Sequence, residues 1–262
     1  MRIKANGIQV NYALSGRKGA PVVVLSHSQS ASLLMWNPQM DVLNPHFQVL
    51  RYDIRGQGSS DAPSGAYTLE LLAEDVIGLL DALSINEVHF VGLSVGGMIG
   101  QALALNHAHR LTSLALCDTA SVIPQEAQPL WEERIKKVLS KGMDALLDET
   151  MERWFTPAFL KQGSPMLEII RKQILATSVQ GYLGCAEAIR RLNYLDRLSA
   201  IKIPTLIMVG EDDPGTPVSA SKAIHERISN SKLVILPSAR HLSNVEQSEA
   251  FNANLLAFLK SQ

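Results

Sequence analysis

Apolar residues cluster in short runs along this chain, and the runs are separated by polar or Gly-, Ser- and Pro-rich stretches. Runs that are apolar throughout, such as VVVL at residues 22–25, are typical of strands that are buried on both faces of a parallel sheet. The strands that this pattern predicts are residues 22–25, 47–52, 88–91, 111–117, 205–209 and 232–236.

Segments with helical periodicity lie between these strands. Thr68 is a typical N-cap residue, and the apolar residues that follow it recur so that they share one helical face. Strands that alternate with helices imply βαβ units with right-handed crossovers. We therefore predict an α/β fold with a mostly parallel central sheet and helices on both faces. Apart from the helix after Thr68, the helices expected in it are residues 99–108, 218–228 and 249–260.

The alternation stops at residues 121–198, where we find no strand pattern and several helical ones. Because the strand–helix alternation resumes afterwards, the chain predicts one α/β core, residues 1–120 and 199–262, that is interrupted by a helical cap insertion. The helical patterns within the insertion cover residues 131–139, 143–154, 165–177 and 183–192.

Composition and charge restrict the class of protein. Of the 262 residues, 46% are hydrophobic and 19% are charged, which is typical of a globular domain. A net charge of −1 gives no reason to expect nucleic acid or an anionic membrane as a partner. No signal peptide is evident, and no segment approaches the roughly 18 unbroken apolar residues of a membrane span. Cys117 and Cys185 suggest two reduced thiols, so we expect a cytoplasmic protein.

The candidate nucleophile is Ser94, which lies in the sequence GLSVG at residues 92–96, after a predicted strand and before a predicted helix. This is the nucleophile elbow, G-x-S-x-G, in which a sharp turn exposes the serine Oγ at the top of the sheet. The glycines avoid collisions with neighbouring backbone. The spacing does not match a dinucleotide fingerprint, and Met98 and Ile99 replace the Lys and hydroxyl of a phosphate loop. The competing interpretation is that the glycines allow tight packing of the strand against the helix and that Ser94 has no catalytic role.

A serine nucleophile needs a base and an acid that orients the base, in the chain order Ser, Asp or Glu, His. His241 follows the last predicted strand, which places it at the carboxyl edge of the sheet, whereas His225 falls in a predicted helix and is expected at the surface. Asp213 follows the preceding strand and is the preferred acid. Asp118, which also follows a strand, is the competing candidate.

An oxyanion hole needs two backbone N–H donors. We expect one from Val95, directly after the serine, and the other from the loop SHSQSA at residues 26–31. Within this loop we assign the N–H of Gln29, with Ser28 as the neighbouring alternative. His27 is expected to be a structural residue whose ring nitrogens are both satisfied.

The elbow and the order of serine, acid and histidine resemble the α/β-hydrolase superfamily over essentially the whole chain. Within it the chain is similar to the 3-oxoadipate enol-lactonases, on the basis of MW at residues 35–36, SVGG at 94–97 and SNVE at 243–246. Two positions depart from that pattern. The loop at residues 26–31 differs from the family's Ser-Asn-Ser-Leu-Gly-Thr, and Gln57 replaces the histidine of the usual R-G-H-G.

The resemblance implies a serine hydrolase that opens a small, carboxylate-bearing enol-lactone through an acyl-enzyme, with no metal or organic cofactor. The cap would then lie over the site and contribute substrate contacts. Arg190 and Arg191 are further arginines of the insertion. The competing interpretation for every arginine there is an ion pair at the surface. For the tryptophans it is packing within the core of the cap. The substrate-binding candidates are Trp36, Trp131, Arg134 and Trp154.

Two rival functions are compatible with the same residues. The first is a broad carboxylesterase or a different lactonase that uses the same triad, and a perhydrolase side activity also occurs in the superfamily. The second belongs to another class, a ligand receptor built on a hydrolase fold, in which turnover is slow and serves signalling.

Overall fold

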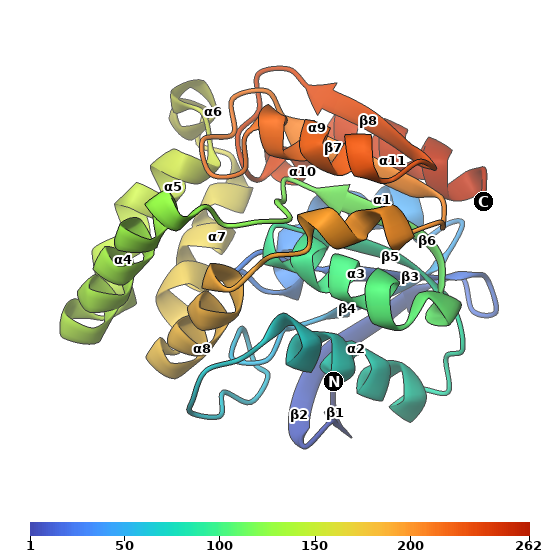
Figure 1. Ribbon diagram of the computed structural model, residues 1–262, viewed down its shortest axis with the longest axis horizontal. Coiled ribbons are helices and arrows are strands. Elements are labelled where there is room, and N and C mark those ends of the chain that lie inside the picture. The colour runs from blue at the N-terminus through green and yellow to red at the C-terminus, as the bar shows by residue number, and fades with distance from the viewer.

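The computed structural model describes residues 1–262, and an eight-stranded sheet lies at its centre, in the order β1-β2-β4-β3-β5-β6-β7-β8 (Figure 1). The pairs β1–β2 and β2–β4 are antiparallel, and all the other pairs are parallel. This confirms the mostly parallel sheet. The strands are β1 (Arg2–Ala5), β2 (Ile8–Gly16), β3 (Val22–Ser26), β4 (Gln48–Tyr52), β5 (Val88–Leu93), β6 (Leu111–Cys117), β7 (Thr205–Gly210) and β8 (Ser231–Leu236).

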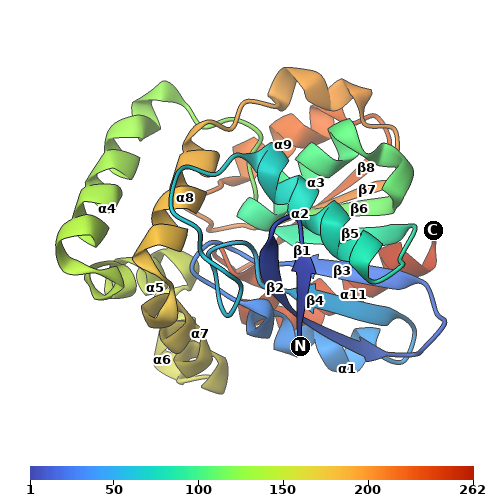
Figure 2. The ribbon, with the colours of Figure 1, turned by 90° about the horizontal axis from the view of Figure 1, so that it is seen from below.

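Helices cover both faces of the sheet. The α-helices are α1 (Met40–Leu43), α2 (Leu69–Ala82), α3 (Val95–Asn106), α4 (Gln128–Lys141), α5 (Leu147–Trp154), α6 (Pro157–Gln162), α7 (Pro165–Ala176), α8 (Val179–Arg190), α9 (Val218–Arg227), α10 (Ser243–Glu246) and α11 (Ser248–Lys260). Helices α2, α3 and α9 lie on one face, and α1 and α11 lie on the other (Figures 1 and 2). None of the helices has the length and apolar character that crossing a bilayer requires.

Each face of the sheet has its own hydrophobic core, because successive side chains of a strand point to opposite faces. Val24 and Phe90 belong to the core beneath α2 and α3, whereas Val23 and Val91 belong to the core beneath α11. Both kinds of position are therefore buried, which explains why the central strands are apolar throughout.

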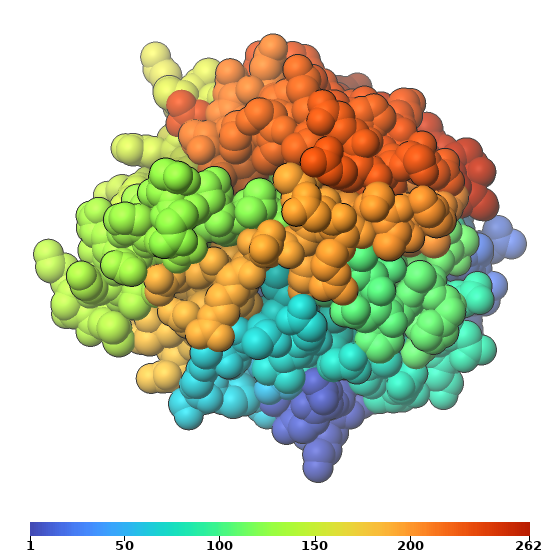
Figure 3. Space-filling view, viewed as in Figure 1, coloured from blue at the N-terminus to red at the C-terminus, as the bar shows by residue number.

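Only helices occur between β6 and β7, apart from an isolated bridge between Val122 and Asn193. Helices α4 to α8 gather at one end of the molecule (Figures 1 and 2), and in the space-filling view green atoms of this segment border the orange atoms of the later part of the chain (Figure 3). The backbone of α8 packs directly against the backbone of the loop after β4, since a Cβ on Gly181 would lie 1.7 Å from the carbonyl oxygen of Gly56. The helical segment therefore packs directly against the loop that follows β4.

The N-terminal hairpin, β1 and β2, was not among the predicted strands. Its two strands are joined by Asn6 and Gly7, which have φ angles of 43° and 81°. An Asn-Gly pair between strands is the sequence signal for such a two-residue turn. The strands themselves gave a weak signal because the hairpin lies at the edge of the sheet and much of β2 is only partly buried.

Two details of the helices correct the sequence prediction. Helix α3 begins at Val95 rather than at residue 99, because the elbow turns directly into the helix. In α4, which covers the helical pattern predicted at residues 131–139, Leu139 is 62% exposed, whereas Val138 is buried. Helix α4 thus leaves part of its apolar surface open to solvent.

Candidate active site

Ser94 occupies a sharp corner between β5 and α3, with φ 58° and ψ −119°. A Cβ on Gly92 would lie 2.1 Å from the carbonyl oxygen of Gly96, and a Cβ on Gly96 would lie 2.2 Å from that of Ser26. Side chains at these two positions are therefore excluded, as the motif predicts. The Ser94 side chain makes no hydrogen bond that caps α3, so its hydroxyl is not used to begin the helix.

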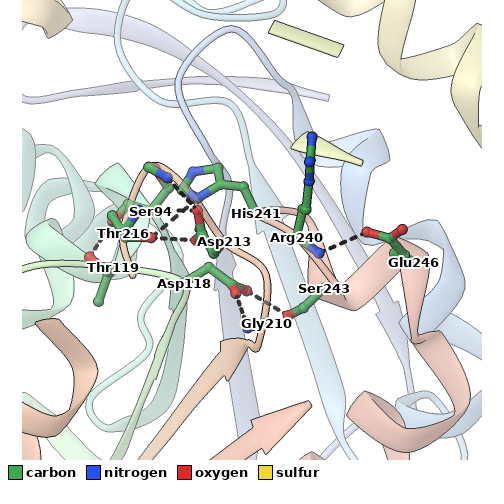
Figure 4. A network of polar contacts seen from close by, with 11 residues as sticks. Ser94, Asp118, Thr119, Gly210, Asp213, Thr216, Arg240, His241, Ser243 and Glu246 are labelled. Carbon is green, nitrogen blue, oxygen red and sulfur yellow. Dashed lines mark hydrogen bonds and ion pairs between the residues drawn. The ribbon is translucent and has the colours of Figure 1, made fainter. Parts of the chain in front are cut away.

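His241 and Asp213 are brought together by the loops that follow β8 and β7 (Figure 4). The His241 Nδ1 lies 2.8 Å from Asp213 Oδ2 and 3.2 Å from the hydroxyl of Thr216. Asp213 Oδ1 accepts hydrogen bonds from the N–H groups of Gly215 and Thr216, at 2.8 and 3.1 Å. With Nδ1–H donated to the carboxylate, a neutral His241 has its lone pair on Nε2, which is the atom that acts as a base.

The surroundings of Asp213 favour its ionised form. Burial alone raises the pKa of this carboxyl, but the charge of His241 and the hydrogen bonds from His241 and Thr216 outweigh that effect, so the pKa lies below its ordinary value. Asp213 is therefore an anion at neutral pH and holds the imidazole in one orientation.

Asp118, the competing acid, is bonded elsewhere. Its carboxyl oxygens accept hydrogen bonds from the N–H of Gly210, at 2.8 Å, and from the hydroxyl of Ser243, at 2.6 Å (Figure 4). Burial and the nearby charge of Asp213 raise the pKa of Asp118 well above its ordinary value. Asp118 thus connects the end of β7 to α10 and makes no contact of the kind that joins Asp213 to His241.

A cavity of about 530 Å³ lies where Ser94 and His241 meet the helical segment. Its volume is within the range of small-molecule sites. Gln29 and Ser28, the two alternatives for the first oxyanion donor, both line it. Val95 is the first residue of α3, where backbone N–H groups have no partner within the helix. The expected residues of the site therefore lie around one cavity or directly beside it.

Three of the four substrate-binding candidates line the same cavity: Trp131, Arg134 and Trp154. The Trp154 ring stacks on the imidazole of His241, with 6.4 Å between the ring centroids and 27° between the planes. Arg134 lies over the Trp131 ring and donates a hydrogen bond to Glu149 at 3.1 Å. The helical segment between β6 and β7 thus supplies an apolar wall and a paired cation to the cavity.

The fourth candidate, Trp36, lies outside the cavity, which corrects the sequence prediction. Its ring is fully buried in the core and packs against Phe251 of α11, with 6.2 Å between centroids, because η1 (Leu33–Gln39) directs it beneath the sheet. Arg190 and Arg191 also lie outside the cavity. Both form ion pairs with Glu187, at 3.0 and 3.6 Å, as the surface interpretation expects.

Two residues have roles that the sequence analysis missed. Arg153, directly before Trp154, lines the cavity, but no periodicity distinguishes it from the other arginines of the segment. Gln57, noted only as a departure from the family, accepts a hydrogen bond from the N–H of Ser30 at 2.8 Å and donates one to the carbonyl of Gly181 at 3.2 Å. Gln57 therefore holds the oxyanion-side loop against α8.

The other singled-out histidines are not at the site. His27 is fully buried, with Nδ1–H donating to the carbonyl of Ser28 at 2.7 Å and Nε2 accepting from the N–H of Ile54 at 3.0 Å, so both nitrogens are satisfied as predicted. His225 is exposed and bonds to Ser231. No group of three or more His, Cys, Asp or Glu side chains is arranged to hold a metal ion.

The sheet, the elbow and the histidine–carboxylate pair are the features of an α/β hydrolase, and the family model described as alpha/beta hydrolase fold matches residues 21–248. The chain belongs to this family, and it is an enzyme of the hydrolase class. Among its relatives is "3-oxoadipate enol-lactonase 2" of Acinetobacter baylyi, which is 35% identical over 98% of this chain and 96% of that protein. The crystal structure of the enol-lactonase from Burkholderia xenovorans LB400 is 38% identical, with a TM-score of 0.96 over 99% of this chain and all of that one.

Another relative has a different name. "Putative carbamate hydrolase RutD" of Yersinia enterocolitica is 32% identical over 92% of this chain and 87% of that protein. Relatives that are named for different substrates thus match this chain at similar identity, so the substrate has to be argued from the cavity.

The burial of His27 leads to a prediction about stability. Burial lowers the pKa of His27 below its ordinary 6.5, so below pH 6.5 the unfolded chain binds a proton that the folded chain does not. The stability due to the neutral ring is complete above pH 6.5 and is lost as the pH falls. Between pH 6.5 and 5.5 we expect the free energy of unfolding, measured in urea, to fall up to about 1 kcal/mol more in the wild type than in His27→Gln. Parallel pH dependences would contradict this account.

Proposed function

We propose that this enzyme hydrolyses carboxylic esters and lactones through a Ser94–His241–Asp213 triad and an acyl-enzyme. The observation that carries the proposal is the hydrogen bond between His241 Nδ1 and Asp213 Oδ2, at 2.8 Å, beside a cavity that Ser94 also lines. The corner at Ser94 and the order of the three residues along the chain support the same assignment.

In the first half of the reaction, Nε2 of His241 takes the proton from Ser94 Oγ as that oxygen attacks the carbonyl carbon of the substrate. The tetrahedral oxyanion accepts hydrogen bonds from the N–H groups of Val95 and Gln29. The C–O bond to the leaving oxygen then breaks, and the imidazolium returns its proton to that oxygen. In a lactone the leaving oxygen remains part of the same molecule, so the whole opened substrate stays on Ser94 as an ester.

In the second half, His241 removes a proton from a water molecule that attacks the acyl-enzyme. The same two N–H groups stabilise the second oxyanion, and the proton on His241 passes to Ser94 Oγ as the product acid leaves. Asp213 stays ionised throughout and stabilises the imidazolium in both halves, in keeping with its lowered pKa.

For the substrate we propose a small enol-lactone with a carboxylate arm, 3-oxoadipate enol-lactone being the best candidate. The names of the Acinetobacter and Burkholderia relatives support this choice, together with a cavity of about 530 Å³ that has an apolar wall and arginine side chains. Opening an enol-lactone releases an enol that becomes a ketone, which favours hydrolysis. A carboxylesterase with the same triad is the alternative.

The first prediction concerns the nucleophile. We expect Ser94→Ala to lower kcat for hydrolysis of 4-nitrophenyl acetate by about 10⁴-fold or more, because no other group in the triad forms the acyl-enzyme. The measurement is release of nitrophenolate in the steady state. Ser140→Ala, on the exposed side of α4, is the matched control and keeps wild-type activity. Equal turnover by Ser94→Ala and the wild type would exclude Ser94 as the nucleophile.

A second prediction separates the two buried carboxyl groups. Asp213→Asn should lower kcat by about 10⁴-fold, because an amide nitrogen facing Nδ1 favours the wrong tautomer of His241. Asp118→Asn should lower it less than about tenfold, because the amide oxygen still accepts from the N–H of Gly210 and the amide nitrogen can donate to Ser243. The same ester assay measures both. The reverse order of the two losses would make Asp118 the acid of the triad.

The third prediction tests the substrate class. We expect kcat/KM for 3-oxoadipate enol-lactone to exceed that for 4-nitrophenyl acetate by at least about tenfold, because only the lactone has a carboxylate for the arginines of the cavity. Spontaneous opening of the lactone is subtracted with Ser94→Ala. A preference for the aryl ester would reject the lactonase proposal and leave the serine mechanism in place.

A further inference from the structure

The cavity is positively charged. Of its 26 lining residues, two are arginines, Arg134 and Arg153, and none is Asp or Glu. A cleft with charge of one sign and apolar walls concentrates ligands of the opposite sign. The lining therefore favours an anionic ligand before any particular contact is considered.

The two arginines differ in their partners. Arg134 forms an ion pair with Glu149, its Nε lying 3.1 Å from the carboxylate, and its guanidinium lies over the Trp131 ring. Arg153 has no such partner, since no hydrogen bond or ion pair acts on its guanidinium and only more distant charges do. The charge of Arg134 is thus largely compensated within the protein, and that of Arg153 is not.

Arg153 also lies close to the reacting groups. The point at which a Cβ on Gly215 would stand is 3.7 Å from Arg153 Cδ, 3.9 Å from His241 Nδ1 and 3.4 Å from Asp213 Oδ1. The arginine stem and the histidine–carboxylate pair therefore lie on the surroundings of the same residue, Gly215. Ser94 and Arg153 both line the cavity, so one bound molecule can face both side chains.

Arg153 is half-buried at the cavity and has no close counter-charge. A cation that is partly removed from water without a partner is less favourable than a paired one. Burial and the like charge of Arg134 lower the pKa of Arg153 to about 10, which still leaves it protonated at neutral pH. A carboxylate is the complementary group, because its two oxygens match the planar guanidinium.

We propose that Arg153 binds the carboxylate arm of the substrate and makes this enzyme selective for anionic esters and lactones over neutral ones. The inference rests on the serine-hydrolase function proposed above and adds to it the side chain that recognises the carboxylate of the substrate. Arg134 shapes the cavity and adds to its positive potential, while its own charge is paired with Glu149.

The competing explanation is structural. Arg153 lies in the last turn of α5, where a cation interacts favourably with the helix dipole. Such a role affects all substrates equally, and its loss destabilises the fold. Carboxylate recognition instead affects only acidic substrates, and removing an uncompensated cation leaves the melting temperature unchanged or raises it. The two explanations therefore predict different measurements.

The test uses two esters that share a six-carbon acyl chain, neutral 4-nitrophenyl hexanoate and anionic mono-4-nitrophenyl adipate. For Arg153→Met we expect kcat/KM on the adipate ester to fall about 10- to 100-fold, the value of a charge-assisted hydrogen bond, and that on the hexanoate ester to change less than threefold. Arg153→Lys should recover part of the loss because it restores the charge. Arg171→Met, which removes an arginine paired with Asp148 on the protein surface, is the matched control.

A second readout does not require turnover of an acidic ester. Adipate should inhibit hydrolysis of the hexanoate ester competitively, with an inhibition constant at least tenfold higher in Arg153→Met and intermediate in Arg153→Lys. Equal losses on both esters, or unchanged inhibition by adipate, would overturn the role of Arg153. Failure of the serine mechanism gives a different result, namely hexanoate hydrolysis that survives Ser94→Ala, so the two proposals are tested separately.

Discussion

The backbone corner at Ser94 is the constraint on which the rest of the site depends. A serine with φ 58° and ψ −119° is in a region that L-residues rarely occupy, and such a residue costs of the order of 1–3 kcal/mol. The corner persists because its surroundings determine it. The N–H of Ser94 donates to the carbonyl of Cys117 at 2.9 Å, and its carbonyl accepts from the hydroxyl of Thr119 at 2.7 Å. The end of β6 and the loop that follows it thus hold both ends of the strained residue.

The loop that carries His241 is held just as firmly, by side chains that also contact the helical segment. Ser243 donates to Asp118 beneath the sheet edge, and Glu246 accepts from the N–H of Arg240 at 2.8 Å and from the N–H of Thr156 at 2.9 Å. Because Thr156 begins α6, one carboxylate joins the loop of the candidate base to the cap helices. A short network of hydrogen bonds therefore links the loop that carries His241 to the helical segment.

Sequence patterns anticipated the parts of this protein that depend on local rules. The central strands are continuous apolar runs because both of their faces are buried. The elbow can be recognised in the sequence because Gly92 and Gly96 have no room for a Cβ, which makes glycine necessary at both positions. Contacts between distant segments could not be read in this way. Trp36 lies beneath the sheet because η1 packs against α11, and Arg153 reaches the cavity because of how α5 sits over the loop after β7. The hydrophobic periodicity around Trp36 and Arg153 does not predict that the first contacts α11 or that the second lines the cavity.

The same distinction explains how the chemistry and the specificity are divided within the fold. The candidate nucleophile, base and acid all lie directly after strands of the sheet, so their positions follow from the architecture that the family shares. The side chains that line the rest of the cavity, including Trp131, Arg134 and Arg153, come from helices whose packing the sheet does not determine. Relatives that are named for lactone and for carbamate hydrolysis can therefore share the core and still differ in what they accept. In this chain the cavity is lined by two arginines and no acidic side chain; Arg134 is paired with Glu149, and Arg153 has no close partner.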